Sequence, residues 1–151
     1  MAGSKKVKRK ENPVGKGATR NVDPNKFYQE RPAWCFNSID MSMWSLNESS
    51  AGGKIWEILQ KLKNFETQTW NEILLQHKTQ NHMIAPDDLN KIAQDRLAEM
   101  HIEAEAITSL RLTGNHRLYG YNDGRVFNVI WYDEEHGDNS SCVCRSKKKH
   151  T

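Results

Sequence analysis

Apolar residues follow three different patterns along the chain, and the first pattern is their near absence. Residues 1–27 show no apolar periodicity and combine two prolines and three glycines with a run of charges. Such a segment buries too little apolar surface to offset the entropy lost on folding. We therefore expect a disordered tail over 1–27 and a single domain over 28–151.

Helical spacing begins after a short predicted strand. Residues 33–40 follow a proline and alternate imperfectly, which predicts the strand. Over 54–64 apolar residues recur three and four positions apart, as on one face of a helix. Thr69 is of an N-cap type and precedes a short predicted helix at 70–74, whereas the polar stretch 77–82 predicts a loop.

The main helix has the strongest start signal. Proline is tolerated in a first helical turn, and the carboxylates of Asp87 and Asp88 suit the positive end of the helix dipole, so Pro86 marks the start. Apolar residues then form one stripe at helical spacing: Leu89, Ile92, Ala93, Leu97 and Met100. We expect this stripe to face the core.

Beyond residue 106 the apolar period shortens to that of β-strands. Three segments are rich in aliphatic and aromatic residues: 107–113, 116–122 and 125–132. Asp123-Gly124 is a favoured two-residue hairpin turn between the last two. With these residues at the centre of the turn, the facing pairs are Tyr121 with Val126, Tyr119 with Asn128 and Arg117 with Ile130.

Alternation of side chains divides these strands into two faces. One face collects the apolar residues that we expect in the core: Leu110, Leu112, Leu118, Phe127, Val129 and Trp131. The other face collects Ser109, Arg111, Thr113, Arg117, Tyr119, Tyr121, Asn128 and Tyr132. His116 falls on the core side and is expected to be a structural histidine.

These elements predict an α+β fold in the order β-α-α-β-β-β. It would be a two-layer sandwich in which an antiparallel sheet packs its apolar face on the helices. The first strand would join at the edge of the sheet or beside the last hairpin. The other face would stay open and expose two arginines and three tyrosines together.

Composition adds that the chain is a globular protein of one domain. It has 151 residues, of which 36% are hydrophobic, and no apolar run of the length that crosses a bilayer. The start is basic and has no apolar segment behind it, so we expect neither secretion nor a membrane partner. The chain has only three cysteines, a small and odd number that does not suit a disulfide framework, which favours a reducing, cytoplasmic location.

Charge is segregated along the chain. The net charge is +3, but residues 1–20 carry +6, residues 145–149 carry +4 and residues 21–144 carry −7. Basic ends suit a polyanion, because each neutralised phosphate releases counterions. The run from Lys5 to Lys10 could be an RNA-binding arm, an import-like signal or a solubilising tail.

The absence of several known motifs excludes some classes of chemistry. The sequence has no G-x-G-x-x-G, Walker loop or nucleophile elbow, which excludes dinucleotides, nucleoside triphosphates and serine-hydrolase chemistry. We expect no small-molecule cofactor and no metal. A zinc-stabilised nucleic-acid-binding module is the weaker alternative, with Cys142, Cys144, His136 and His150 as ligands.

Three segments carry a resemblance to a known family. They are L-R-L-T-G-N-H-R-L-Y-G-Y (110–121), F-N-V-I-W-Y-D-E-E-H (127–136) and S-K-K-K-H-T (146–151). In this order, after the strand and the helices, they resemble the RelE/YafQ-like superfamily of bacterial toxins over Trp34–Thr151. The resemblance implies a toxin of a type II toxin-antitoxin pair. Such a toxin is an endoribonuclease that cleaves mRNA, often on the ribosome, by metal-independent attack of the 2′-hydroxyl, and a cognate antitoxin holds it inactive.

Cleavage of this kind needs a proton carrier and stabilisation of the phosphorane-like transition state. His136 is the candidate acid or base, since the ordinary pKa of histidine is near ~6.5, and His150 is its complement if the tail folds back. Arg111 and Arg117 are the candidate phosphate clamp. Each residue has an alternative interpretation. His136 could be an exposed histidine in a turn, and His150 could lie in a frayed terminus. The two arginines could pair with surface carboxylates.

Further residues are candidate RNA contacts. Aromatic rings on the open face would stack on bases, and amide and ammonium groups would contact the chain: Tyr119, Tyr121, Tyr132, Asn128, Lys147, Lys148 and Lys149. The rings could equally pack under a loop. Glu134 and Glu135 beside His136 would repel a phosphate. The alternative function is therefore a non-catalytic RNA- or protein-binding member of the same fold, encoded by a phage or mobile element.

Overall fold

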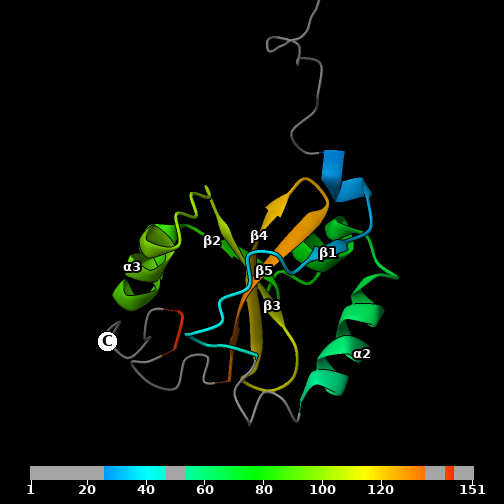
Figure 1. Ribbon diagram of the computed structural model, residues 1–151. Helices are drawn as coiled ribbons and strands as arrows, with labels where there is room; N and C mark the ends of the chain where they lie inside the picture. Colours follow the sequence, from blue (N-terminus) through cyan, green and yellow to red (C-terminus); the bar gives the residue numbers. More distant parts are fainter. Residues whose placement is uncertain (1–25, 47–53, 135–141, 145–151) are drawn as a thin grey trace, which may run out of the picture.

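The computed structural model describes residues 26–46, 54–134 and 142–144 and has an α+β fold (Figure 1). A mixed five-stranded sheet has the order β1-β5-β4-β3-β2. Its strands are β1 (Ala33–Cys35), β2 (His82–Ile84), β3 (Ile107–Arg111), β4 (Arg117–Asp123) and β5 (Val126–Asp133). β1 lies at the edge beside the last hairpin, as predicted, but it runs parallel to β5, so the prediction of an antiparallel sheet is wrong for this strand.

Two α-helices and one π-helical segment connect the strands. They are α2 (Ile55–Phe65), η3 (Asn71–Gln76) and α3 (Lys91–Glu99). The predicted cap at Thr69 is confirmed, because its Oγ1 accepts the Glu72 N–H at 3.3 Å while the Glu72 carboxylate accepts the Thr69 N–H at 2.8 Å. This reciprocal capping box satisfies two backbone donors at the start of η3.

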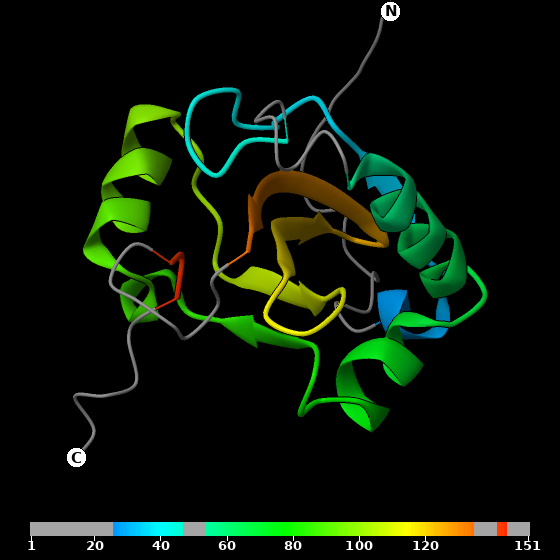
Figure 2. The same cartoon turned by 90° about the horizontal axis from the view of Figure 1, so that it is seen from below.

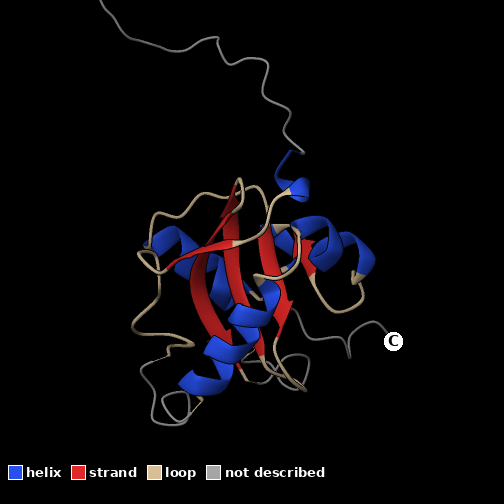
Figure 3. Cartoon of the chain, turned by 90° about the vertical axis from the view of Figure 1, so that its right-hand side faces the viewer, coloured by secondary structure: helices blue, strands red, loops and turns tan. Residues whose placement is uncertain are grey.

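Both faces of the sheet are covered, so the predicted two-layer sandwich with one open face is wrong. α2 and η3 pack on one face and α3 packs on the other (Figures 1 and 2). Seen from its own side, α2 lies across the strands (Figure 3). The second core forms because Ile107, Tyr119, Ile130 and Trp131 give the supposedly open face an apolar surface that Leu97 of α3 buries.

The β4–β5 hairpin is confirmed, but its register differs from the prediction. Tyr121 faces Asn128 and Asp123 faces Val126, so Gly124 and Arg125 are the central residues of the turn. Gly124 takes a φ of +60°, which glycine adopts without steric cost. The predicted pairs are therefore displaced by two residues, which keeps each side chain near the turn on its predicted face.

A β-bulge then reverses the two faces along β5. Gly120 faces Val129 but Tyr119 faces Trp131, so Ile130 is the extra residue. As a result Trp131 turns to the α3 side and Tyr132 to the α2 side, opposite to the prediction for both.

Three further predictions are wrong. The stretch predicted as loop ends in β2, which pairs with β3 at His82–Ser109. Pro86–Asp88 forms a separate 3₁₀ turn, and α3 begins after Asn90, whose side chain accepts the Ile92 N–H at 3.0 Å. Ile92 is 47% exposed and does not belong to the buried stripe.

The fold begins earlier than expected. The ring of Phe27 lies 6.4 Å from that of Trp70 and packs on the core, although the prediction assigned it to the tail. The expected disorder of residues 1–25 lies outside the described residues. Within the described part of the chain, none of the helices has both the length and the apolar character needed to span a bilayer.

Candidate phosphate-binding site

The sheet brings Arg111 and Arg117 together, as the sequence predicts. They are facing residues of β3 and β4, and on its other side Arg117 faces Asp133 of β5. Their neighbours Leu110 and Leu118 pack in the α2-side core, so alternation directs both arginines to the α3 side. Two guanidinium groups thus lie at one end of the sheet.

Arg117 is only partly saturated with hydrogen-bond acceptors. One Nη donates to the carbonyl oxygens of Gly114, at 2.7 Å, and His116, at 3.2 Å. Its Nε is buried and makes no hydrogen bond with the described residues. Burial, and then the positive charge of Arg111, lower the pKa of Arg117. An anion bound between the two groups would relieve this repulsion.

The alternative in which these arginines pair with surface carboxylates is not seen in the described part of the chain, where neither guanidinium takes part in an ion pair. Asp133 and Cys144 lie close enough to Arg117 to favour its charge. The Asp133 carboxylate accepts the Val143 N–H at 2.8 Å, which holds the segment Cys142–Cys144 at this end of the sheet.

Two of the three predicted stacking tyrosines are buried, so the expectation that they offer open rings to bases is wrong. Tyr119 is inaccessible in the α3-side core, and burial raises its pKa. Tyr132 is buried on the α2 side, because the bulge turns it there. Tyr121 and Asn128 are partly buried, and the Tyr121 hydroxyl lies 3.4 Å from Ser38 Oγ; their contact with RNA stays a prediction.

His116 has the structural role that was predicted. Its Nδ1 lies 2.6 Å from the Tyr132 hydroxyl. Burial, and then the nearby Glu134, raise the pKa of Tyr132, so its phenol stays protonated in this contact. The Tyr132 side chain lies on the α2 side of the sheet, opposite to the side of the arginine side chains.

The remaining predicted site residues belong to the C-terminal part of the chain. His136, His150, Lys147, Lys148 and Lys149 lie outside the described residues. The described residues Glu134 and Cys144, which adjoin these stretches in the chain, both belong to the end of the sheet where Arg117 lies. Among the described residues, no group of three or more histidine, cysteine or acidic side chains is arranged to hold a metal ion.

Asp40 is buried at the centre of a polar network and was not among the predicted site residues. Its carboxylate accepts hydrogen bonds from Arg96 of α3 at 2.8 and 3.0 Å, from Trp131 Nε1 at 2.9 Å, and from the N–H groups of Ser42 and Met43 at 2.9 and 3.1 Å. Burial alone would raise the pKa of Asp40, but these donors outweigh it and hold the pKa well below its usual range. An aspartate at the end of a short predicted strand resembles a turn residue, so nothing in the sequence marks it.

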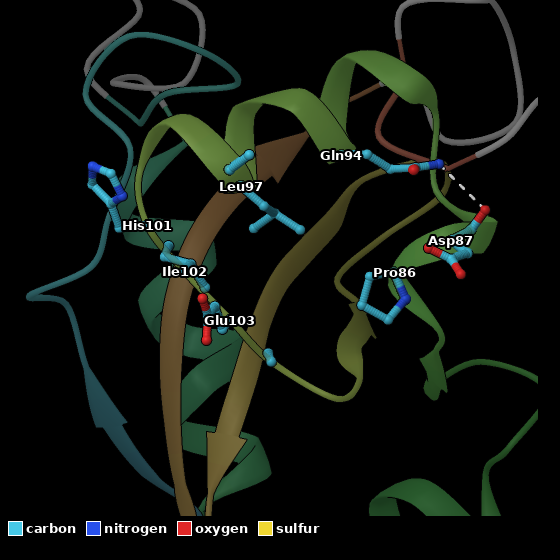
Figure 4. Close-up of a pocket in the computed structure, with 9 residues that line it drawn as sticks. Pro86, Asp87, Gln94, Leu97, His101, Ile102 and Glu103 are labelled. Carbon is cyan, nitrogen blue, oxygen red and sulfur yellow. Dashed lines mark hydrogen bonds between the residues drawn. The ribbon is translucent and has the colours of Figure 1, made fainter.

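Two pockets in the described part of the chain have linings that include neither Arg111 nor Arg117. One of about 390 Å³ opens beside α3, between the apolar side chains of Leu97 and Ile102 and the polar side chains of Asp87, His101 and Glu103 (Figure 4). A second, of about 420 Å³, is lined in part by Glu103, Glu105 and Asp123. Among the described residues no lysine or arginine lines either pocket, so neither suits a phosphate group.

Comparisons with protein-family models, with curated proteins and with solved structures return no match to this chain.

Proposed function

We propose that this protein binds RNA and that Arg111 and Arg117 hold one of its phosphate groups. The observation that supports this most is their position as facing residues on adjacent strands, with the buried Nε of Arg117 lacking a partner among the described residues. A guanidinium presents several N–H donors in a plane, which matches the oxygens of a phosphate.

Charge along the chain supports a polyanion as the ligand. The basic run 145–149 follows directly after Cys144, which lies near Arg117. RNA is chosen among polyanions because of the resemblance to the RelE/YafQ-like superfamily. The acidic pockets described above are on other parts of the surface and do not oppose such a ligand at the arginine pair.

The second candidate is the mRNA-cleaving toxin, with a cognate antitoxin as its partner. In the sequence, only Glu134 and Glu135 separate His136 from Asp133, the strand partner of Arg117. His136 is the candidate proton carrier of such a toxin. His116 is engaged with Tyr132, which lies on the other side of the sheet, so we assign the proton transfers of this candidate to His136 and His150.

RNA binding is tested by the salt dependence of affinity for a labelled single-stranded RNA. Arg111→Gln and Arg117→Gln should each weaken binding by ~10- to 100-fold, since each removes hydrogen bonds to a charged group. Each should also reduce the slope of log affinity against log salt by about one phosphate contact. Arg111→Lys should recover the slope but not the full affinity, because ammonium keeps the charge and loses the paired donors.

Arg125→Gln is the matched control, because this exposed arginine at the hairpin turn carries the same charge. Equal effects at all three positions would show only a general loss of charge and would contradict the proposed site. Incubation of the same RNA with the wild-type chain separates the two candidates. Cleavage that is lost in His136→Ala, with binding retained, identifies the toxin; binding without cleavage, alone or with ribosomes, identifies the binding protein.

A further inference from the structure

We propose that Cys142 and Cys144 form a reversible dithiol–disulfide pair, a redox site whose chemistry does not depend on the proposed RNA binding. Their sulfur atoms lie 3.2 Å apart, and the Cys142 thiol also donates to the Cys144 carbonyl oxygen at 3.0 Å. The two residues are not linked by a disulfide in the structure. Both side chains are buried, so the sulfurs face each other out of bulk water.

The backbone around the pair is anchored on two sides. The Val143 N–H donates to Asp133 at the end of β5, and the Val143 carbonyl accepts the Asn90 N–H at 2.9 Å. Cys144 also forms a β-bridge with Leu89, and the Val143 side chain is fully buried in the α3-side core. Because this short segment is held between the sheet and the start of α3, the two thiols stay in position to react with each other.

The oxidant we propose is a low-molecular-weight disulfide such as oxidised glutathione. Cys144 is 7% exposed and Cys142 is not exposed at all, so Cys144 reacts first. Its thiolate attacks one sulfur of the oxidant, a mixed disulfide forms, and one glutathione thiolate leaves. The Cys142 thiolate then attacks the Cys144 sulfur and displaces the glutathione. Two protein thiols are oxidised to one disulfide, one oxidised glutathione is reduced to two thiols, and the two protons from the cysteines end on these thiols.

Cys35 provides an internal comparison. It lies on β1 opposite Asn128, and its side chain is partly exposed. Asn128 lies at the turn end of β5, whereas the cysteine pair is anchored to Asp133 at the other end of the strand. A single thiol of this kind can retain a glutathione adduct, but it has no neighbouring thiol to resolve it.

The test is intact mass spectrometry and thiol mapping of the full-length chain, first reduced and then treated with oxidised glutathione. We expect a disulfide between Cys142 and Cys144, seen as a loss of two hydrogen atoms from that segment, so that an alkylating reagent labels neither of these cysteines after denaturation, whether Cys35 is a free thiol or carries a glutathione. Reduction should return all three thiols. The proposal is overturned if Cys142 and Cys144 both remain alkylatable, if each retains a glutathione, or if the disulfide formed includes Cys35.

Matched variants assign the order of the steps. Cys35→Ser should form the disulfide at the wild-type rate. Cys142→Ser should stop at the mixed disulfide on Cys144, whereas Cys144→Ser should react much more slowly, because only the fully buried Cys142 remains of the pair. The wild-type mapping requires no substitution, so it decides the proposal even if a serine variant fails to fold. A stable mixed disulfide on Cys142 in the Cys144→Ser chain, formed as fast as the wild-type product, would contradict the proposed order.

Discussion

Replacement of Asp40 by asparagine should destabilise the fold strongly, because five hydrogen bonds converge on its carboxylate. The bonds join three parts of the chain: the loop that holds Asp40, helix α3 through Arg96, and strand β5 through Trp131. The side chain of Asp40 is fully buried and that of Arg96 is 23% exposed. Asparagine has nearly the same shape, but it carries no charge and turns an NH₂ group toward donors.

The expected loss is about 3 kcal/mol at neutral pH, the lower end of the ~3 to 5 kcal/mol found when one partner of a buried ion pair is removed. The lower end applies because Arg96 keeps a second partner, Glu99, at 3.0 Å. Asp95→Asn is the control on the same helix, since Asp95 pairs with Lys91 on the surface and its side chain is 59% exposed. The control should cost no more than about 0.5 kcal/mol.

Urea unfolding followed by tryptophan fluorescence measures both losses. With an m-value of ~1 to 3 kcal/mol per molar urea, a 3 kcal/mol loss lowers the midpoint by about 1 to 3 M. The pH dependence adds a second check. The donors hold the pKa of Asp40 low in the folded state, so its contribution is complete above the unfolded pKa of ~3.9 and is lost as the pH falls toward the folded pKa. Below pH ~3.9 the difference between wild type and Asp40→Asn should narrow by up to ~1.4 kcal/mol per pH unit. A loss equal to that of Asp95→Asn, or a difference that does not narrow in acid, would refute this account of the network.

Two backbone positions give further predictions. At the end of α3 the Ile102 N–H donates to the Leu97 carbonyl oxygen, and the His101 N–H donates to the Ala98 carbonyl oxygen. His101 takes the left-handed conformation, with a φ of +58°. His101→Gly should therefore stabilise the protein by about 1 kcal/mol and raise the melting temperature by ~2 to 4 °C, because glycine adopts this conformation without steric cost. His101→Ala should bring no such gain. Equal melting temperatures for the two variants would contradict this prediction. At the bulge, a Cβ on Gly120 would overlap the Asn128 carbonyl oxygen and lie 2.7 Å from Phe127 Cζ. Gly120→Ala should cost about 1 to 3 kcal/mol in urea unfolding, more than Gly114→Ala, whose Cβ would meet open space at a φ of +49°; the reverse order would show that the bulge yields easily.

Much of the local structure could be predicted from the sequence, because short-range contacts decide it. The helix over α2 follows from apolar spacing, the cap at Thr69 from residue type, and the three C-terminal strands from alternation. The juxtaposition of Arg111 and Arg117 also follows, since both lie close to the connection between consecutive strands. In each case the interacting residues are near neighbours in the chain.

Tertiary packing decided the features that the sequence left open. The alternation of side chains along β5 does not predict that Ile130 is an extra residue. This residue nevertheless turns Trp131 toward Asp40 and Tyr132 toward His116. The second core likewise depends on α3 settling over the face that alternation marked as open, because a tyrosine suits either a wet surface or an apolar interior. Asp40 finds its partners 56 and 91 residues away, and no local pattern records such contacts. The physical reason is the same for all three: burial on this sheet is set by which distant element covers it, and only the folded chain specifies that element.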